Sequence, residues 1–218
     1  MKKNIIKKIA SISLFSIFSI QMTYLIVEPT VVTAVTDDVV VTLNVTDGIT
    51  ITDGAPVTMA PDIGIASDRS VGTSSWNVKT NSDSGYTLAV KASASPALVN
   101  GVIDSFADYT EAVNNTPDAW GGVASGQKEF GFSGYGTHVL ASFYQNSPAN
   151  CGNTGTGVPN ADLKYLGFET SDQTLASSNT YTTTAGVTTT ICFAAEQNAV
   201  YAASGTYTAT ITGTALVQ

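Results

Sequence analysis

Residues 74–93 read SSWNVKTNSDSGYTLAVKAS, and two runs within them alternate apolar with polar side chains. A period of two is typical of strands that bury one face, so residues 75–80 and 86–91 are predicted to be strands. The segment 81–85 between them contains Asn, Ser, Asp and Gly, which predicts a five-residue hairpin loop. The side chains expected in the core are Trp76, Val78, Tyr86, Leu88 and Val90.

The same alternation recurs over the rest of the chain, and long helical periodicity is absent. In residues 206–215 threonine occupies every second position, and the positions between are mostly apolar. The pairs Asp47-Gly48 and Asp53-Gly54 predict tight turns, and the Gly- and Asn-rich residues 145–160 predict a loop. Further strands are expected at 39–46, 49–52, 129–132, 139–144, 164–168 and 188–194, with a short helical turn at 104–112. This pattern predicts an all-β fold, an antiparallel β-sandwich with long loops.

The N-terminus has the layout of a secretory signal peptide. Four lysines among the first eight residues precede an apolar run, and the small residues Val32-Thr33-Ala34 follow it. Cleavage after Ala34 would leave a single secreted domain, residues 35–218, either free or at the cell surface. The alternative is an uncleaved membrane anchor, because the 19 residues from Ile9 to Val27 are near the lower limit for spanning a bilayer.

The charge of the chain argues against nucleic-acid binding. Four of the nine basic residues and one of the 17 acidic residues lie in the predicted signal peptide. The processed chain would therefore keep five basic and 16 acidic residues, a formal charge of −11. Such a surface repels phosphate backbones, and we expect no nucleic-acid partner. A membrane contact is expected only through the signal segment, if it stays uncleaved.

The two cysteines, Cys151 and Cys192, are predicted to form a disulfide, because an exported chain folds in an oxidising compartment. Cys151 lies in the Gly- and Asn-rich loop, and Cys192 lies in an apolar, strand-like run. A bridge would therefore tie the loop to the core, with Cα atoms about 4.4–6.8 Å apart. Two free thiols are the alternative.

No motif in the sequence names a reaction. The single histidine, His138, follows Ser133, but Tyr135 stands where a nucleophile elbow needs Gly. His138 is interpreted as a loop or strand-end residue. A pair of carboxylates suited to glycoside hydrolysis could meet in space, although nothing in the spacing selects one. The chain is therefore predicted not to be an enzyme, with a secreted hydrolase as a minor alternative.

No cofactor and no resident metal are predicted. Two cysteines and one histidine are too few for a structural zinc site. Calcium is the most reasonable cation, because it takes oxygen ligands and residues 81–85 carry such ligands at alternate positions. That segment is shorter than an EF-hand loop and lacks its closing Glu, so the hairpin turn is the preferred interpretation.

Three aromatic residues in Gly-rich surroundings are candidates for ligand binding: Trp120, Tyr135 and Tyr144. Trp120 stands between Asp118 and Gly121-Gly122, a context that can expose an indole ring for stacking on a sugar. The ordinary alternative is that all three pack in the core, as an all-β protein requires large apolar side chains.

Three stretches resemble exported β-rich surface proteins of bacteria: SSWNVKTNSDSGYTLAVKAS at 74–93, EFGFSGYG at 129–136 and CFAAEQNAVYAASGTYTATITGTA at 192–215. More loosely, Trp76-Asn77-Val78 and the closing SGTYTATITGTA are similar to WxL-domain proteins, although Val78 stands where that family has Leu. The resemblance implies export, a β-sandwich and a surface role, and WxL modules attach non-covalently to the Gram-positive cell wall. It implies no catalytic residue.

These observations predict a non-enzymatic, exported cell-surface or extracellular protein with a structural, adhesive or wall-associated role. The expected partners are cell-wall polymer, a glycan or other surface proteins, including copies of the chain itself. The alternative is a carbohydrate-binding module that uses Trp120 and neighbouring loop aromatics.

Overall fold

The computed structural model describes residues 39–101 and 103–218, and the compact unit begins at Val45. The predicted signal peptide, residues 1–34, lies outside the described residues. Within the part of the chain that is described, no helix has the length and apolar character needed to cross a membrane. The predicted all-β class is confirmed, because β-strands in several antiparallel sheets form the body.

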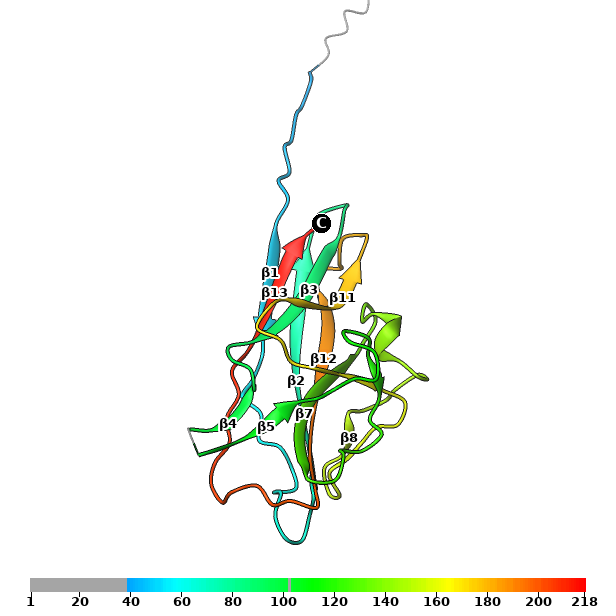
Figure 1. Cartoon of the computed structure of the whole chain (residues 1–218). Coiled ribbons are helices and arrows are strands. Elements are labelled where there is room, and N and C mark those ends of the chain that lie inside the picture. The colour runs from blue at the N-terminus through cyan, green and yellow to red at the C-terminus, as the bar shows by residue number, and fades with distance from the viewer. Residues whose placement is uncertain (1–38, 102) are drawn as a thin grey trace, which may run out of the picture. The chain divides into compact units, whose positions relative to one another are not determined.

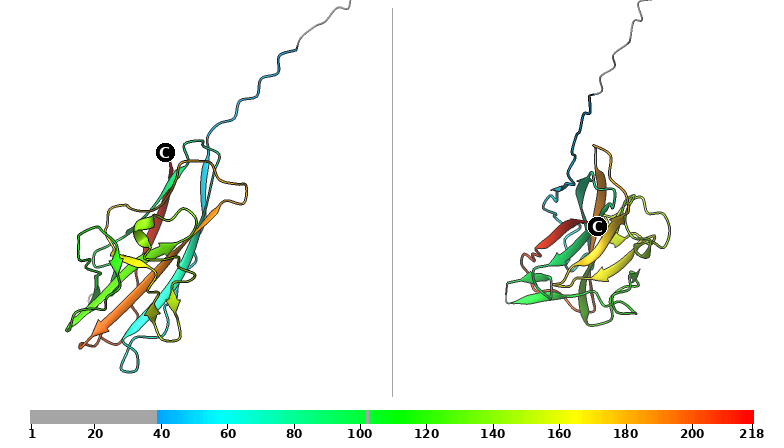
Figure 2. Two further views of the ribbon diagram at one scale, coloured as in Figure 1. Left: turned by 90° about the vertical axis from the view of Figure 1, so that its right-hand side faces the viewer. Right: turned by 90° about the horizontal axis from the view of Figure 1, so that it is seen from above.

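The body is a sandwich of one large and one small sheet (Figures 1 and 2). The main path of the eight-stranded sheet runs in the order β1 (Ile49–Asp53), β2 (Arg69–Thr80), β12 (Val187–Asn198), β7 (Gln127–Tyr135), β10 (Lys164–Gly167) and β6 (Asp118–Ala119). Off this path, β5 (Asp104–Asp108) pairs with β7 and with β4 (Leu98–Asn100). The three-stranded sheet is β11 (Gln173–Ser178), β3 (Tyr86–Ala92) and β13 (Ile211–Val217). A small ladder joins β8 (Gly152–Asn153) to β9 (Val158–Pro159).

The predicted hairpin at residues 81–85 is wrong, because β2 and β3 belong to different sheets. β2 pairs with β1 and β12, whereas β3 pairs with β11 and β13, so residues 81–85 arch from one layer to the other. Gly85 is required in this arch: its φ is +80°, and a Cβ there would overlap the carbonyl of Ser178. The faces of the two strands were predicted correctly, since both still point into the same core.

That core fills the space between the two sheets. Its buried members come from alternate positions of the strands, as the period of two requires. They include the five residues expected from the sequence, together with aromatic and aliphatic side chains of the other strands. The phenylalanines among these additional members are Phe106, Phe130, Phe132, Phe143, Phe168 and Phe193, and the fully buried aliphatic ones include Leu175 and Ile191.

Strand β12 is covered on both faces. Ile191 and Phe193 point into the core between the sheets, whereas Cys192 and Ala194 belong to a second buried cluster. Because side chains alternate along a strand, this second cluster lies on the outer face of the eight-stranded sheet. Its buried members are Val71, Tyr109, Cys151, Leu163, Tyr165, Cys192 and Ala194, and we call them the outer cluster.

The indole of Trp76 closes the core where β13 passes over it. Trp76 is buried, and a Cβ on Gly213 would lie 2.7 Å from its Cε2 atom. A Cβ on Gly54 would lie equally close to its Nε1 atom. The glycine that interrupts the Thr-rich run 206–215 therefore leaves room for the tryptophan ring.

Residues 39–46 do not form the predicted strand, and the Asp47-Gly48 turn is absent too. Gly48 lacks the positive φ that a two-residue type I′ turn needs. The side chain of Asn81 forms hydrogen bonds with the backbone of this segment. Its Oδ1 accepts from Gly48 N at 2.6 Å, and its Nδ2 donates to Thr46 O at 2.9 Å. β1 does end at Asp53, where Gly54 has a φ of +93°, but the tight turn predicted at Asp53-Gly54 is absent as well, because Gly54 N donates to Ser75 O at 2.8 Å and continues the pairing with β2.

Two further segments have a different type of secondary structure from the one predicted. Residues 104–108, expected as a helical turn, form β5, because Phe106 is buried and the strand pairs with β4 and β7. Residues 141–143, expected as part of a strand, form a 3₁₀ turn that buries Phe143. The strands expected at 49–52, 129–132, 164–168 and 188–194 are present as β1, β7, β10 and β12, and the C-terminal one starts later, at Ile211.

Asp104 ties the segment before β13 to the large sheet. Its carboxylate pairs with Lys128 on β7 and accepts hydrogen bonds from Tyr207 Oη at 2.6 Å and Ala203 N at 2.8 Å. The hydrogen bond from Lys128, followed by that from Tyr207, holds the pKa of Asp104 well below its usual range. Burial, followed by the hydrogen bond to Asp104 and the charge of that carboxylate, raises the pKa of Tyr207 to about 12, so the phenol stays protonated and donates.

We expect Gly213→Ala to lower the free energy of unfolding by about 1–3 kcal/mol, because the added methyl overpacks the rigid Trp76 ring. Urea unfolding followed by tryptophan fluorescence measures the change. Thr212→Ala, at the exposed neighbouring position of β13, is the matched control and should change stability far less. Equal stability of the Gly213 variant and the parent protein would contradict this packing.

We expect Asp104→Asn to lower the free energy of unfolding at neutral pH by about 1–3 kcal/mol, because hydrogen bonds to a charged group are lost. A carboxyl whose pKa is lowered by folding stabilises the protein above its unfolded pKa, 3.8, and this stabilisation is lost as the pH falls. The difference between parent and variant should therefore shrink as the pH falls from about 4 towards 2. A gap that stays constant, or one that Asp83→Asn reproduces, would show that the carboxylate charge is not responsible.

Candidate functional site

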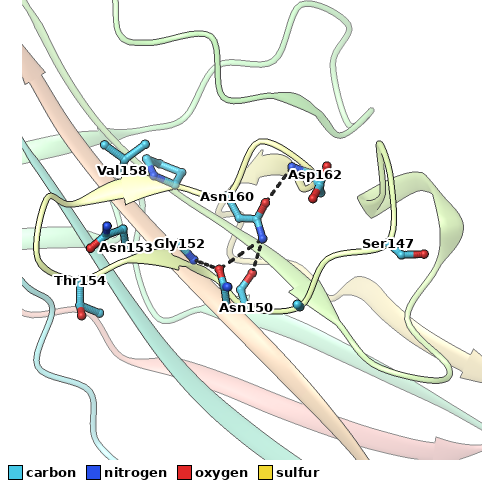
Figure 3. A pocket seen from close by; sticks show the side chains of 10 residues that line it. Ser147, Asn150, Gly152, Asn153, Thr154, Val158, Asn160 and Asp162 are labelled. Carbon is cyan, nitrogen blue, oxygen red and sulfur yellow. Dashed lines mark hydrogen bonds between the residues drawn. The ribbon is translucent and has the colours of Figure 1, made fainter.

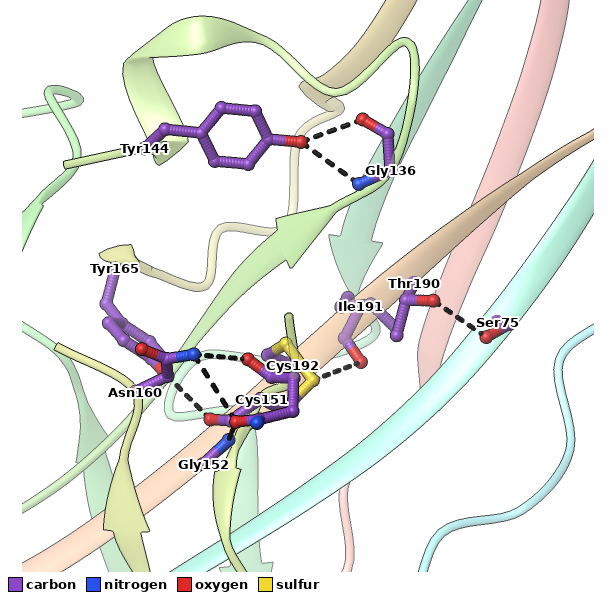
Figure 4. The surroundings of a disulfide bond; sticks show 11 residues. Ser75, Gly136, Tyr144, Cys151, Gly152, Asn160, Tyr165, Thr190, Ile191 and Cys192 are labelled. Carbon is purple, nitrogen blue, oxygen red and sulfur yellow. Dashed lines mark hydrogen bonds between the residues drawn. A yellow bond between two sulfur atoms is a disulfide. The ribbon is translucent and has the colours of Figure 1, made fainter. Parts of the chain in front are cut away.

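A disulfide fixes the long loop to the outer face of the large sheet. Cys151 and Cys192 are bonded, with Cα atoms 5.1 Å apart, which confirms the predicted pairing (Figure 4). Backbone contacts hold the same place: the carbonyl of Cys151 accepts from Asn160 N at 3.1 Å and from Tyr165 Oη at 3.3 Å. The loop therefore covers the outer cluster as a structured layer.

Trp120 lies on this layer and is held on three sides. Its ring stacks on Tyr109 with centroids 4.5 Å apart and meets Tyr165 edge-on at 5.2 Å. Its Nε1 donates to Glu196 Oε2 at 2.6 Å. The ring is neither fully buried nor surrounded by aliphatic side chains, and it remains partly exposed. Its orientation is thus fixed before any ligand arrives, which lowers the entropy cost of binding.

The carboxylate that accepts from the Trp120 indole also forms an ion pair. Glu196 is buried, and its second oxygen, Oε1, accepts from Arg69 Nη2 at 2.9 Å. Arg69 Nε is also buried and has no hydrogen-bond partner among the described residues. Opposite Glu196 in the ladder is Glu129, and burial, followed by nearby carboxylates, raises the pKa of Glu129. Carboxylates thus lie behind the indole, and Arg69 is the guanidinium that lines the surface beside Trp120.

Two hollows adjoin Trp120 and the loop. The smaller one, about 270 Å³, is lined by the indole with Arg69, Gln145 and Asn160 among others. The larger, more open one, about 640 Å³, is lined by residues of the loop, half of which carry an amide or a hydroxyl group (Figure 3). Both share Val158, Pro159 and Asn160, so they are neighbours on one surface. The polar residues of the larger hollow are Ser147, Asn150, Asn153, Thr154, Asn160 and Asp162.

The three candidate aromatics lie around the same cluster but differ in role. Trp120, Tyr135 and Tyr144 all pack against the outer cluster. Trp120 lines a hollow, whereas Tyr135 and Tyr144 line neither of the two. The hydroxyl of Tyr144 is used internally, since it donates to Gly136 O at 2.8 Å and accepts from Gly136 N at 3.0 Å (Figure 4).

The polar residues beside Trp120 were not found from the sequence. Gln145 and Asn160 lie in the segment that was interpreted only as a loop, although its repeated asparagines were a usable signal. Arg69 precedes the predicted strand 75–80, and its contact with Glu196 depends on the register between β2 and β12. The pairing of β2 with β12 joins distant segments of the chain, so no local sequence pattern predicts its register.

The catalytic candidates do not come together. Ser133 is buried with no hydrogen-bond partner among the described residues, so it shares no proton with His138. His138 Nδ1 instead shares a hydrogen bond of 3.0 Å with Tyr86 Oη. In residues 39–101 and 103–218, no three His, Cys, Asp or Glu side chains gather as metal ligands would. Asn81, in the segment considered for calcium, uses its amide on Thr46 and Gly48.

Comparison of the chain with protein-family models, with curated proteins and with solved structures gives no match.

Removing the disulfide should weaken the fold without abolishing the sandwich. The bond closes a loop with a sequence separation of 41 residues, and loop-closure entropy predicts a loss of about 4 kcal/mol in Cys151→Ala/Cys192→Ala. Guanidinium unfolding of variant and oxidised parent measures this difference. Reduced parent protein is the control and should unfold at the concentration found for the variant. A midpoint equal to that of the oxidised protein would contradict a stabilising bond.

Proposed function

We propose that this chain is an exported, non-enzymatic protein of the cell surface or extracellular space, with a structural, adhesive or wall-associated role. The observation that carries the proposal is the Cys151–Cys192 disulfide, which uses both cysteines of the sequence. Such a bond persists in oxidising compartments and is rare in the cytosol. The lysine-rich, then apolar N-terminus agrees with the same destination.

The rest of the described body supports a binding or structural role. The buried carboxylate Glu196 is engaged by Trp120 and Arg69, and Asp104 by Lys128 and Tyr207. These carboxylates hold structure together, since each accepts hydrogen bonds from neighbouring elements. The polar side chains at the hollows are amides and hydroxyls, together with the indole of Trp120, the guanidinium of Arg69 and the carboxylate of Asp162, and groups of these kinds bind polar polymers.

Fractionation of cells that express the full sequence tests the destination. We expect the protein in the medium or on the surface, shortened by 34 residues, with both cysteines resistant to alkylation until reduced. Cytoplasmic protein with two reactive thiols would contradict the proposal. Retention on purified cell walls is compared with retention on a partner-free matrix, and equal recovery would remove the wall-associated version.

The hollow beside Trp120 favours a second candidate, a carbohydrate-binding module. An indole of fixed orientation next to Arg69, Gln145 and Asn160 offers a stacking surface with polar groups at its edge. If wall polysaccharide binds here, Trp120→Ala and Gln145→Ala should each weaken binding about tenfold, as loss of a central contact does. Tyr181→Ala, at an exposed aromatic between β11 and β12, is the control. Calorimetry that finds equal affinity in all three variants would exclude this site.

A further inference from the structure

An uncharged apolar segment precedes the sandwich and is exposed. Residues 39–45, which we call the arm, read VVVTLNV. Their odd-numbered side chains are all apolar, and Val39, Val41, Leu43 and Val45 are 75–87% exposed. Such alternation is typical of a strand with one buried face, yet the arm belongs to no strand in the structure. A contiguous apolar stretch of this kind marks an interaction site.

The chain cannot turn back at Asp47-Gly48 to pair the arm with its own β1 without losing existing bonds. A two-residue hairpin would need positive φ at Gly48, which is not found. Thr46 O and Gly48 N are already bonded to the Asn81 amide, and Asn81 N donates to Gly48 O at 3.4 Å. These bonds hold residues 46–48, just before the start of β1, against Asn81, and a turn at this point would break them.

The sandwich offers a matching edge at β13. Thr210 O accepts from Ser93 N, and the register pairs Ile211 with Ala92. Even-numbered residues of β13 therefore bond to β3, and odd-numbered residues direct N–H and C=O away from it. Among residues 39–101 and 103–218, no strand pairs with this second side of β13. An open strand edge is a template for another strand.

Arm and edge agree in length and charge. The arm spans seven residues, as does β13. Neither contains a charged residue, so two copies of an acidic chain, net charge −8, meet here without local repulsion. The inner face of β13 has small residues at Gly213 and Ala215, after Ile211, and β13 is in contact with β1 (Figures 1 and 2). Apolar side chains of an added strand would cover this margin of the core.

We infer that the arm of one copy adds as a strand to the outer edge of β13 in a second copy of this chain. The three-stranded sheet becomes four-stranded, and the apolar side of the arm is buried against the margin of the partner's core. Donor and acceptor are different surfaces, so the contact is head-to-tail and repeats along a row of copies. The inference deepens the proposed structural role and rests on it, because removal of residues 1–34 would place the arm near the new N-terminus.

Two variants test the inference, one that disrupts the arm and one that disrupts the outer edge of β13. Val41→Glu/Leu43→Glu charges the apolar side of the arm and leaves β13 intact. Val217→Pro removes an outward N–H of β13 and leaves its bonds to β3 intact, since Val217 is odd-numbered and partly exposed. The controls are Thr42→Glu/Asn44→Glu, which adds the same charge to the other side of the arm, and Val217→Ala, which keeps the N–H.

The variants are expressed from the full sequence in exporting cells, and the exported protein is purified with its disulfide formed. Light scattering after size exclusion gives the mass over a range of concentrations. We expect parent and control proteins to form concentration-dependent oligomers, and each test variant alone to associate at least about tenfold more weakly. An equimolar mixture of the two test variants should form a one-to-one dimer, because one supplies the arm and the other the edge. Circular dichroism verifies that each variant is folded.

Monomeric parent protein at all concentrations would overturn the inference, as would a mixture that stays monomeric. Concentration-independent protection of arm amides from hydrogen exchange in a monomer would show pairing within one chain and would overturn it too. Mass spectrometry of the N-terminus separates the two proposals: retention of residues 1–34 in exporting cells counts against export, whereas processed monomers count against strand addition alone.

Discussion

The burial of β12 on both faces is the constraint on which the rest of the structure depends. Its odd-numbered side chains fill the core between the sheets, and Cys192 and Ala194 support the outer cluster. A strand covered twice must be apolar at nearly every position, as the run from Ile191 to Ala195 is. The core between the sheets and the outer cluster are therefore both built on one central strand.

The outer layer is where surface chemistry concentrates. A Gly- and Asn-rich loop has too little apolar surface to order itself, and the disulfide supplies the missing restraint. Once the loop is fixed, the ring of Trp120 is held by Tyr109 and Glu196, and polar groups gather beside it. Glu196 can be buried here because both of its carboxylate oxygens accept hydrogen bonds, one from Arg69 and one from Trp120. These bonds offset the cost of removing a carboxylate from water.

Sequence patterns predicted which faces are buried better than which strands pair. The period of two placed Trp76 and Leu88 correctly in the core, because burial of one face is a local property. It failed for the 81–85 arch, since pairing of β2 with β12 depends on residues more than a hundred positions away. The arm alternates apolar and polar residues as a strand does, but no strand is assigned to it. The hydrogen bond from Trp120 to Glu196 joins residues far apart in the sequence, so no local pattern predicts it. The cysteine pair was predictable because the two thiols had no other partner in the sequence.

Hydrogen exchange of oxidised and reduced protein tests the two-layer account most directly. If the disulfide is the main restraint on the outer layer, reduction should speed exchange of amides in residues 145–163 while those of β3 and β12 stay protected. Cys151→Ala/Cys192→Ala should show the same pattern without reductant. Simultaneous loss of protection in both layers would contradict the account, because the loop and the sandwich would then unfold as one unit. Unchanged protection of residues 145–163 would contradict it as well.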